Sequence, residues 1–308
     1  GFFAPRSHRV VDCENCILQP PIFADIVKIF RKFIIKNGIT VYDSEKHTGL
    51  LRHIYLRLAE ATGEVMVCAV INGEDLPHKN ELIEKLTEIP SVKSIVLNIN
   101  RDRTNVILGK ECVTVWGNDC IYDVLCGVKV RLSPLSFYQV NHDMAQQLYE
   151  KAAEYACLSG KETVLDMYCG TGTIGLSMAK KAKRIIGAEI VPEAVLDAKR
   201  NALENGIENA EFICADAGEA AQELSSRGIK PDVVLLDPPR KGCSEMLLAE
   251  IVKMSPERIV YVSCDPSTLA RDCFRLKDLG YETKRLAAAD LFPRTVHVES
   301  VALLTKQK

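Results

Sequence analysis

The spacing of hydrophobic positions changes near residue 163 of the chain. Beyond it, short apolar runs alternate with segments in which apolar residues recur every three or four positions. The short runs predict buried strands and the longer segments predict helices. Their regular alternation predicts an α/β fold, with a doubly wound, mostly parallel sheet. We expect strands at 163–167, 184–188, 210–213, 232–236, 258–262 and 300–304, with helices between them, such as 192–205 and 244–254.

The first part of the chain follows another pattern. Apolar residues at helical spacing predict a helix over 22–34, which starts after Pro20 and stops at Gly38. Alternation around 54–58 predicts a half-buried strand. Further elements are expected as a helix at 79–87 and strands at 65–71, 92–99, 106–108, 112–116 and 128–132. We therefore expect a smaller mixed α/β domain at 1–128 and a Rossmann-like doubly wound domain at 129–308.

Composition narrows the class of protein. The chain has 308 residues, of which 47% are hydrophobic and 26% charged, so a buried core is available and global disorder is not expected. A formal net charge of -2 shows no basic excess, so any contact with RNA must come from a local patch. The twelve cysteines have irregular spacing and follow no secretory segment, which predicts reduced thiols in a cytoplasmic protein. No apolar run is long enough for a membrane span, and nothing predicts a protein partner.

A glycine-rich turn lies between the first predicted strand of the second domain and the helix after it. Its spacing, Gly170-x-Gly172-x-x-Gly175, is typical of a nucleotide-type fold, in which the backbone turns sharply beside a ligand. Glu189 ends the next apolar run, about 20 positions later, where such folds hold ribose hydroxyls. The alternatives are an ordinary turn and a surface carboxylate.

Several polar residues follow the predicted parallel strands. Ligands of such sheets bind beyond the carboxyl ends of the strands, so these residues are expected to gather at one edge. Asp237 ends a buried run before two prolines, and its carboxylate is suited to accept a hydrogen bond from a cofactor or substrate; the alternative is a simple Asp-Pro-Pro turn. The full set of strand-end candidates is Asp166, Tyr168, Glu189, Asp216, Asp237 and Cys264.

Cys264 from this set, and Glu299 near the end of the chain, are candidates for chemistry beyond binding. Cys264 stands where a nucleophile is expected, and a reactive thiol needs surroundings that lower its pKa, for which Arg240 and Arg271 are possible cationic neighbours. Glu299 precedes an apolar run, where partial desolvation suits a carboxylate to act as a base. His297 is an alternative base. An inert core thiol and a surface glutamate remain open interpretations.

Two further patterns have a simpler explanation. Cys13-x-x-Cys16 lacks a second ligand pair nearby, so we interpret it as two ordinary thiols and predict no metal site in the chain. Phe137 and Tyr138 lie next to the domain junction. Packing is the favoured interpretation of these rings, and stacking on an unpaired base is the alternative.

Taken in order, five motifs resemble those of the RNA uracil-5 methyltransferase family, most closely its members that act on 23S rRNA. The resemblance covers nearly the whole chain. The motifs are Gln139-Val140-Asn141, Leu165-Asp166-Met167-Tyr168-Cys169-Gly170-x-Gly172, Leu236-Asp237-Pro238-Pro239-Arg240, Ser263-Cys264-Asp265-Pro266 and His297-Val298-Glu299.

The resemblance implies S-adenosylmethionine as methyl donor. It implies RNA as substrate, with 23S rRNA as the leading candidate. It implies Cys264 as the nucleophile that attacks uracil C6 and Glu299 as the base that removes the C5 proton. The target base must leave its stack to reach the thiol, and Phe137 is a candidate to hold it. The implied cofactor contacts are Gln139, Tyr168, Gly170, Glu189 and Asp237, with Asp216 as a neighbour on the adenine side.

Family members usually carry an N-terminal RNA-binding β-barrel, so we expect the chain to be a fragment without this module. Many relatives also hold an iron–sulfur cluster on four cysteines. Cys16 matches the last of these cysteines, and the other three would precede Gly1. The resemblance therefore implies a cluster only in a longer parent protein.

Three other functions stay open at this point. A tRNA uracil-5 methyltransferase differs from the leading hypothesis only in its target. An amine-directed methyltransferase is suggested because the Asp237-Pro238-Pro239-Arg240 motif resembles one that grips an amino group. A non-enzymatic protein that holds cofactor and RNA without turnover is the third.

Overall fold

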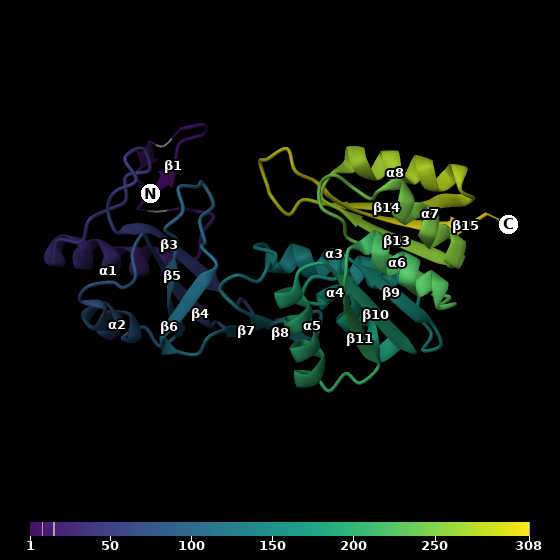
Figure 1. Cartoon of the computed structure of the whole chain (residues 1–308), viewed down its shortest axis with the longest axis horizontal. Helices are drawn as coiled ribbons and strands as arrows, with labels where there is room; N and C mark the ends of the chain where they lie inside the picture. Colours follow the sequence, from purple (N-terminus) through teal and green to yellow (C-terminus); the bar gives the residue numbers. More distant parts are fainter. Residues whose placement is uncertain (8, 15, 308) are drawn as a thin grey trace. The chain divides into compact units, whose positions relative to one another are not determined.

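The structure is a computed structural model that describes residues 1–7, 9–14 and 16–307. It divides into two compact units, which are traced along the chain in Figure 1. Unit 1 comprises Gly1–Asp123 and Leu132–Leu135, and unit 2 comprises Val124–Arg131 and Ser136–Lys308. The domain boundary predicted after residue 128 falls within the segment Val124–Arg131, which groups with unit 2.

Unit 2 is built on a seven-stranded sheet with the order β11-β10-β9-β12-β13-β15-β14. Its first five strands are parallel, whereas β15 runs antiparallel to both β13 and β14. The strands are β9 (Thr163–Met167), β10 (Arg184–Glu189), β11 (Ala210–Cys214), β12 (Val233–Leu236), β13 (Arg258–Ser263), β14 (Tyr281–Ala289) and β15 (Glu299–Lys306).

Helices cover both faces of this sheet. Helices α3, α4 and α5 pack on one face, and α6, α7 and α8 pack on the other (Figure 1). The sheet is therefore a doubly wound α/β sheet, as the alternation of apolar patterns predicts. The helices are α3 (His142–Ala156), α4 (Thr173–Met178), α5 (Pro192–Glu204), α6 (Ala217–Ser226), α7 (Glu245–Met254) and α8 (Pro266–Asp278).

The central strands are apolar along their whole length because both faces are covered. Leu165 and Met167 of β9 point to the side of α6, α7 and α8, together with Val234 of β12 and Tyr261 of β13. Asp166 points to the opposite side, where its carboxylate accepts a hydrogen bond from Gly175 at the start of α4. This one inward carboxylate interrupts an otherwise hydrophobic strand.

The elements of unit 2 match the sequence pattern closely, with one omission. The structure has strands at all six predicted positions, with ends that differ by one or two residues. The strand β14 was not predicted, because Glu282, Lys284 and Arg285 break its apolar pattern. It is the edge strand of the sheet, so most of its side chains are exposed and need not be apolar.

Unit 1 contains a four-stranded sheet with the order β3-β4-β5-β6. Its hydrophobic core includes Phe30 of α1, Leu82 of α2, and Val67 and Leu97 of the sheet. The elements of unit 1 are α1 (Pro21–Asn37), α2 (Lys79–Thr87), β3 (Leu51–Leu58), β4 (Val65–Ile71), β5 (Val92–Ile99) and β6 (Glu111–Gly117), with a two-stranded sheet of β1 (Phe2–Phe3) and β2 (Val10–Val11). A further two-stranded sheet is formed by β7 (Ile121–Leu125) and β8 (Val128–Leu132), whose residues are divided between the two units.

The strand predicted at 106–108 is wrong, because this segment forms a loop. The side-chain amide of Asn100 donates to the carbonyl oxygens of Val106 and Ile107, at 2.8 and 3.0 Å. These bonds hold the backbone in a turn, so the apolar side chains of Val106 and Ile107 lie on the surface.

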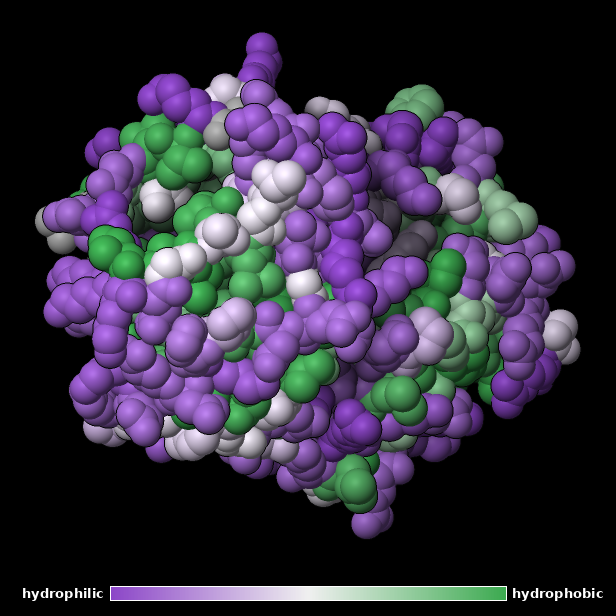
Figure 2. All heavy atoms as spheres, turned by 60° about the vertical axis from the view of Figure 1, so that its left-hand side comes forward, coloured by the Kyte–Doolittle hydropathy of each residue, from purple (hydrophilic) through white to green (hydrophobic). Residues whose placement is uncertain are grey.

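The surface is mostly polar. Figure 2 shows hydrophilic side chains over most of one face, with hydrophobic side chains gathered in smaller patches. Among the residues that the structure describes, no helix has the length and apolar character needed to cross a bilayer.

Candidate active site

A cavity of about 1040 Å³ lies in unit 2 at the carboxyl ends of the parallel strands. This is the edge at which doubly wound sheets bind their ligands. The eight residues that the sequence singled out as catalytic or cofactor-binding all line it, namely Gln139, Tyr168, Gly170, Glu189, Asp216, Asp237, Cys264 and Glu299.

Two different structural constraints require glycine in the turn after β9. Gly170 and Gly172 have φ angles of 54° and 81°, a left-handed conformation that side chains disfavour. Gly175 instead allows a close approach, because a Cβ atom there would lie 2.7 Å from Oδ2 of Asp166. The amide nitrogen of Gly175 donates to the same oxygen at 3.0 Å. The turn therefore presents backbone and the start of α4 to the cavity.

Two carboxylates follow the neighbouring strands β10 and β11. Glu189 accepts backbone hydrogen bonds from Gly170 at 3.1 Å and Val191 at 2.9 Å, one on each oxygen. Asp216 caps α6 by accepting from Gly218 at 2.9 Å. The backbone bonds fix both carboxylates at the cavity wall, where carboxylate oxygens retain lone pairs for the hydroxyls of a ligand.

Gln139 and Tyr168 line the cavity together with Glu189 and Asp216. Gln139 lies beside the phenol of Tyr149, a buried side chain of α3. Tyr168 has a φ angle of 64°, which is uncommon for a residue with a side chain and turns its ring toward the cavity. Such strain persists only where the surroundings hold it in place.

Three carboxyl groups have raised pKa values in this region: Asp237 and Glu299 line the cavity, and Asp166 is buried beside the start of α4. Burial raises the pKa of Asp166 to about 7 and that of Asp237 to about 8, and the carboxylate of Glu299 adds to the effect on Asp237. Burial also raises the pKa of Glu299. Oδ1 of Asp166 is buried and has no hydrogen-bond partner among the described residues. This region therefore favours a bound cation or protonated carboxyl groups.

Cys264 and Glu299 lie next to each other because β13 and β15 are antiparallel. Ser263, the last residue of β13, pairs with Ser300 of β15. Cys264 follows this pair and Glu299 precedes it, so both residues leave the sheet at the same edge. Glu299 is 5% exposed, and Cys264 is half-buried. The arrangement brings a thiol and a carboxyl group to one side of the cavity.

The expectation that its surroundings lower the pKa of Cys264 is wrong for the chain alone. Burial raises that pKa, and the carboxylates of Glu299 and Asp237 raise it further. Arg240 opposes this effect, as expected for a cationic neighbour. Arg271 does not have that role, because its guanidinium contacts Asp272 at 2.9 Å and the carbonyl oxygen of Lys241 at 2.8 Å.

The structure adds residues to the cavity that the sequence did not single out as a group. Arg240 lies 3.5 Å from Nε2 of His297, and the His297 ring is 6.2 Å edge-on from that of Phe292. Phe137 also lines the cavity, with its ring 75% exposed. Arg240 and His297 are 57 residues apart in sequence. No sequence pattern predicts that they lie close together in the fold.

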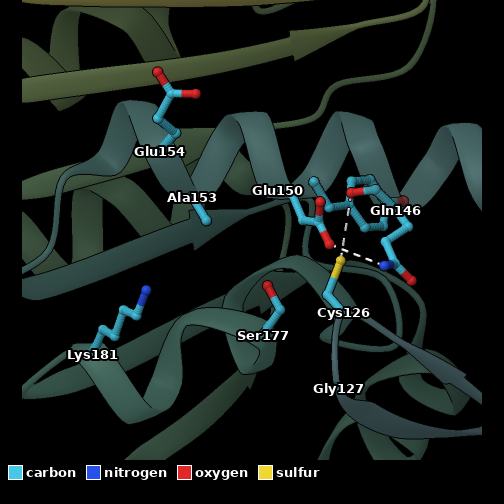
Figure 3. Close-up of a pocket in the computed structure, with 9 residues that line it drawn as sticks. Cys126, Gly127, Gln146, Glu150, Ala153, Glu154, Ser177 and Lys181 are labelled. Atoms are coloured by element: carbon cyan, nitrogen blue, oxygen red, sulfur yellow. Dashed lines mark hydrogen bonds between the residues drawn. The ribbon is translucent and has the colours of Figure 1, made fainter.

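A second cavity of about 520 Å³ lies elsewhere in unit 2 (Figure 3). Its lining includes Gln146 and Glu150 of α3, with Ser177 and Lys181 across from that helix. Burial raises the pKa of Cys126 in its wall to about 12, which favours the protonated thiol. None of the predicted site residues lines this cavity. Among the described residues, no group of three or more His, Cys, Asp or Glu side chains is arranged to hold a metal ion.

Comparison with known proteins identifies relatives of this chain. The tRNA (uracil-5-)-methyltransferase family model matches residues 127–307. A Clostridium tetani protein described as an uncharacterized RNA methyltransferase is 49% identical over 306 residues, which are 99% of this chain and 66% of that protein. A protein of the same description from Halalkalibacterium halodurans is 48% identical over 99% of this chain and 67% of its own length. The chain therefore spans about two thirds of these relatives.

A solved structure shares the fold of the chain. It is the Pyrococcus abyssi tRNA (uracil-54, C5)-methyltransferase in complex with S-adenosyl-L-homocysteine. The TM-score is 0.84 with 32% identity, over 98% of this chain and 72% of that one. This likeness confirms the predicted mixed α/β methyltransferase fold.

Proposed function

Because the chain belongs to the tRNA (uracil-5-)-methyltransferase family, we propose that it transfers a methyl group from S-adenosylmethionine to C5 of a uracil in RNA. The observation that carries this proposal is the adjacent placement of Cys264 and Glu299 at one edge of the sheet. A methyltransferase that acts on an amine needs neither group, whereas methylation of a pyrimidine carbon uses both.

The residues around the cavity fit S-adenosylmethionine. Glu189 and Asp216 follow neighbouring strands and are suited to accept from ribose hydroxyls. Burial and the neighbouring carboxyl groups of Glu299 and Asp166 raise the pKa of Asp237, so a cation beside Asp237 would be favoured. The donor is a cation, and when bound it supplies an electrophilic methyl group on its sulfonium. We propose that Gln139, Tyr168, Gly170 and Asp237 contact it.

Cys264 solves the central difficulty of the reaction, which is that uracil C5 is a poor nucleophile. Its thiolate forms a bond to C6, and the electrons of the C5–C6 double bond move toward the C4 carbonyl to give an enolate. The enolate carbon C5 then takes the methyl group. The pKa of Cys264 is raised in the chain alone, and a cation in the cavity would lower it. Bound cofactor therefore favours the reactive thiolate.

Glu299 completes the reaction by removing the C5 proton. The two electrons of the C5–H bond then restore the C5–C6 double bond, and the Cys264 sulfur leaves C6. Burial raises the pKa of Glu299, which strengthens it as a base once ionised. The exposed ring of Phe137 at the cavity is suited to stack on a uracil that has left its helix.

Replacement of Cys264 tests the proposal. We expect Cys264→Ala to abolish methyl transfer to RNA, whereas Cys273→Ala, which removes a half-buried thiol of α8 that does not line the cavity, keeps it. RNA that contains 5-fluorouridine should form a covalent adduct with the wild-type chain and none with Cys264→Ala. Full activity of Cys264→Ala would favour the amine-directed alternative. Bound RNA without an adduct would favour a non-enzymatic RNA-binding protein.

The kind of RNA that is methylated is proposed separately. We propose a uridine of 23S rRNA, on the resemblance of the five sequence motifs to members that act there. The likeness to the Pyrococcus abyssi tRNA enzyme favours tRNA as the second candidate. Mapping the methylated nucleotide in total RNA from cells that lack the full-length protein decides between them, since loss of a tRNA methylation alone would rule out the rRNA target.

A further inference from the structure

A buried side chain of α5 holds the glycine-rich turn that follows β9. Asn201 of α5 is fully buried, and its side-chain amide nitrogen donates to the carbonyl oxygen of Thr171 at 3.0 Å. Neither Asn201 nor Thr171 lines the cavity, whereas Gly170, the neighbour of Thr171 in the turn, does. The turn is therefore in contact with the cavity through one residue and with the interior of the domain through the next.

The other end of the Asn201 side chain bonds to strand β8. Its amide oxygen accepts from the backbone N–H of Arg131 at 2.9 Å. One partner is a backbone donor and the other a backbone acceptor, so the orientation of the Asn201 amide is determined. The guanidinium of Arg131 contacts the carboxylate of Asp197, one helical turn before Asn201, at 3.1 Å, and both of these side chains are buried. Asn201 is thus fixed firmly between α5 and β8.

The turn needs such an anchor because its conformation is unusual. Gly170 and Gly172 both have positive φ angles, of 54° and 81°. The peptide unit between Thr171 and Gly172 is bonded at both ends: its N–H donates to the carbonyl oxygen of Cys169 at 2.8 Å, and its own carbonyl oxygen accepts from Asn201. Without Asn201 this buried carbonyl group would lose its partner, which favours a rotated peptide and a different turn.

We propose that Asn201 is a positioning residue that holds the glycine-rich turn in the conformation that binds the cofactor. The proposal rests on the proposed function in one respect, which is that Gly170 and Glu189 contact S-adenosylmethionine. These two are joined by the bond from the Gly170 amide to the Glu189 carboxylate at 3.1 Å, so a displaced turn displaces both. Asn201 touches no ligand and acts through the Thr171 carbonyl group. This task explains a polar side chain at a fully buried position, where an apolar one would avoid the cost of desolvation.

A second asparagine of the same region provides a matched control. Asn205 lies one helical turn after Asn201 and also bonds to β8, accepting from the amide of Lys129 at 2.8 Å and donating to its carbonyl oxygen at 2.7 Å. Among the residues that the structure describes, the Asn205 side chain has no hydrogen bond to the turn. Asn205→Ala therefore weakens the contact of α5 with β8 but leaves the Thr171 carbonyl group bonded.

The Kd of S-adenosylhomocysteine, measured by titration calorimetry on the full chain and on each variant, tests the proposal. We expect Asn201→Ala to weaken binding roughly five- to fiftyfold, because the turn loses its buried partner, and Asn205→Ala to change the Kd less than about twofold. Both variants should unfold at lower urea concentrations than the wild type, since both lose bonds between α5 and β8. Hydrogen–deuterium exchange of the segment Tyr168–Gly172, followed by mass spectrometry, should be faster in Asn201→Ala alone.

An unchanged Kd in Asn201→Ala would overturn the proposal, and so would an equal loss of affinity in Asn205→Ala, which would assign the effect to the contact between α5 and β8. Should Asn201→Ala not fold, Asn201→Leu fills the same space without the two bonds, and its comparison with Asn205→Leu decides in the same way. A wild-type chain that binds no S-adenosylhomocysteine would reject the proposed function. The exchange measurement would then still decide on the anchor, since equal exchange of the turn in the wild type and Asn201→Ala overturns it.

Discussion

At the scale of single residues, the protonation of Cys264 depends on the carboxylates beside it. Glu299 and Asp237 both raise the pKa of the thiol, and Arg240 lowers it. In the proposed reaction Glu299 therefore hinders the first step, thiolate attack, and is needed in the last step, removal of the C5 proton. One neutral substitution separates these two effects.

We expect Glu299→Gln to accumulate a covalent complex with ordinary substrate RNA, which contains no 5-fluorouridine. The loss of a negative charge lowers the pKa of Cys264 and eases attack, but the amide cannot remove the C5 proton. Denaturing electrophoresis should show a slowly migrating protein–RNA band, with turnover at least 100-fold below the wild type. Glu245→Gln, which changes another carboxylate at the cavity, should show no such band. Wild-type turnover in Glu299→Gln would show that another group, such as His297, is the base.

Gly175 gives a residue-scale prediction for stability. A Cβ at this position would lie 2.7 Å from Oδ2 of Asp166 and 3.1 Å from Cγ2 of Ile185, both in the core. We expect Gly175→Ala to lower the free energy of unfolding by about 1–3 kcal/mol, measured by urea denaturation. Ser177→Ala, in the same helix, should change it by less than about 0.5 kcal/mol, because that hydroxyl bonds only to its own helix. Equal effects of the two changes would contradict the crowding argument.

Which residues meet at the site was only partly predictable from the sequence. Glu189, Asp216, Asp237 and Cys264 lie at or just after the ends of parallel strands, and one rule on such sheets places them at a common edge. Asp166 lies within β9 and does not line the cavity. The hydrogen bond from the amide of Cys243 to Asp272 at 2.8 Å, in contrast, joins residues that no periodicity relates. Its formation depends on how the loop before α7 packs on α8, which only the folded structure contains.

At the scale of elements, the direction of β15 decides whether the site exists. Had the last strand been parallel to β13, Glu299 at its start would lie at the opposite edge of the sheet from Cys264. The antiparallel pairing of Ser263 with Ser300 brings them together. Sequence pattern predicts a strand at 300–304 but carries no information on its direction. It also missed β14, the polar edge strand that leads into β15.

The start of α8 sets the position of the thiol and yields a prediction at this scale. Asp265 caps the helix by accepting from the amides of Ser267 at 2.8 Å and Thr268 at 3.1 Å, directly after Cys264. We expect Asp265→Ala to cost about 0.5–2 kcal/mol of unfolding free energy in urea denaturation, and to slow methyl transfer because Cys264 loses its anchor. Asp265→Asn retains a capping oxygen and should keep most of both. Loss of stability in Asp265→Asn equal to that in Asp265→Ala would show that charge, not capping, is the cause.

At the scale of the whole molecule, the chain combines a mildly acidic surface charge with buried carboxyl groups at the cavity. The net charge of -2 offers no general attraction for RNA, so the proposed binding depends on local cationic residues. Each unit has its own hydrophobic core, and all the residues proposed for catalysis and cofactor binding belong to unit 2. The two-unit organisation was predictable from the change in hydrophobic spacing, whereas the buried charges of unit 2 were not.

These buried carboxyl groups link folding to pH. The pKa of Asp166 is raised from an ordinary 3.8 to about 7 and that of Asp237 to about 8, so the folded chain binds more protons than the unfolded chain between pH 4 and 8. The free energy of unfolding must then fall as pH rises through this window. Stability from these groups is fully present below about pH 4 and is lost above about pH 8.

We therefore expect the Tm of the ligand-free chain, measured by differential scanning calorimetry, to decrease between pH 5 and 8.5. In Asp166→Asn the decrease should be smaller, because the amide is neutral throughout and its oxygen still accepts from Gly175. Asp232→Asn is the control, since Asp232 bonds to the amide of Thr163 at 2.7 Å at the other edge of the sheet, far from the cavity; its slope should equal that of the wild type. A slope in Asp166→Asn as steep as the wild type would show that Asp166 is already ionised in the folded chain, so that burial does not raise its pKa.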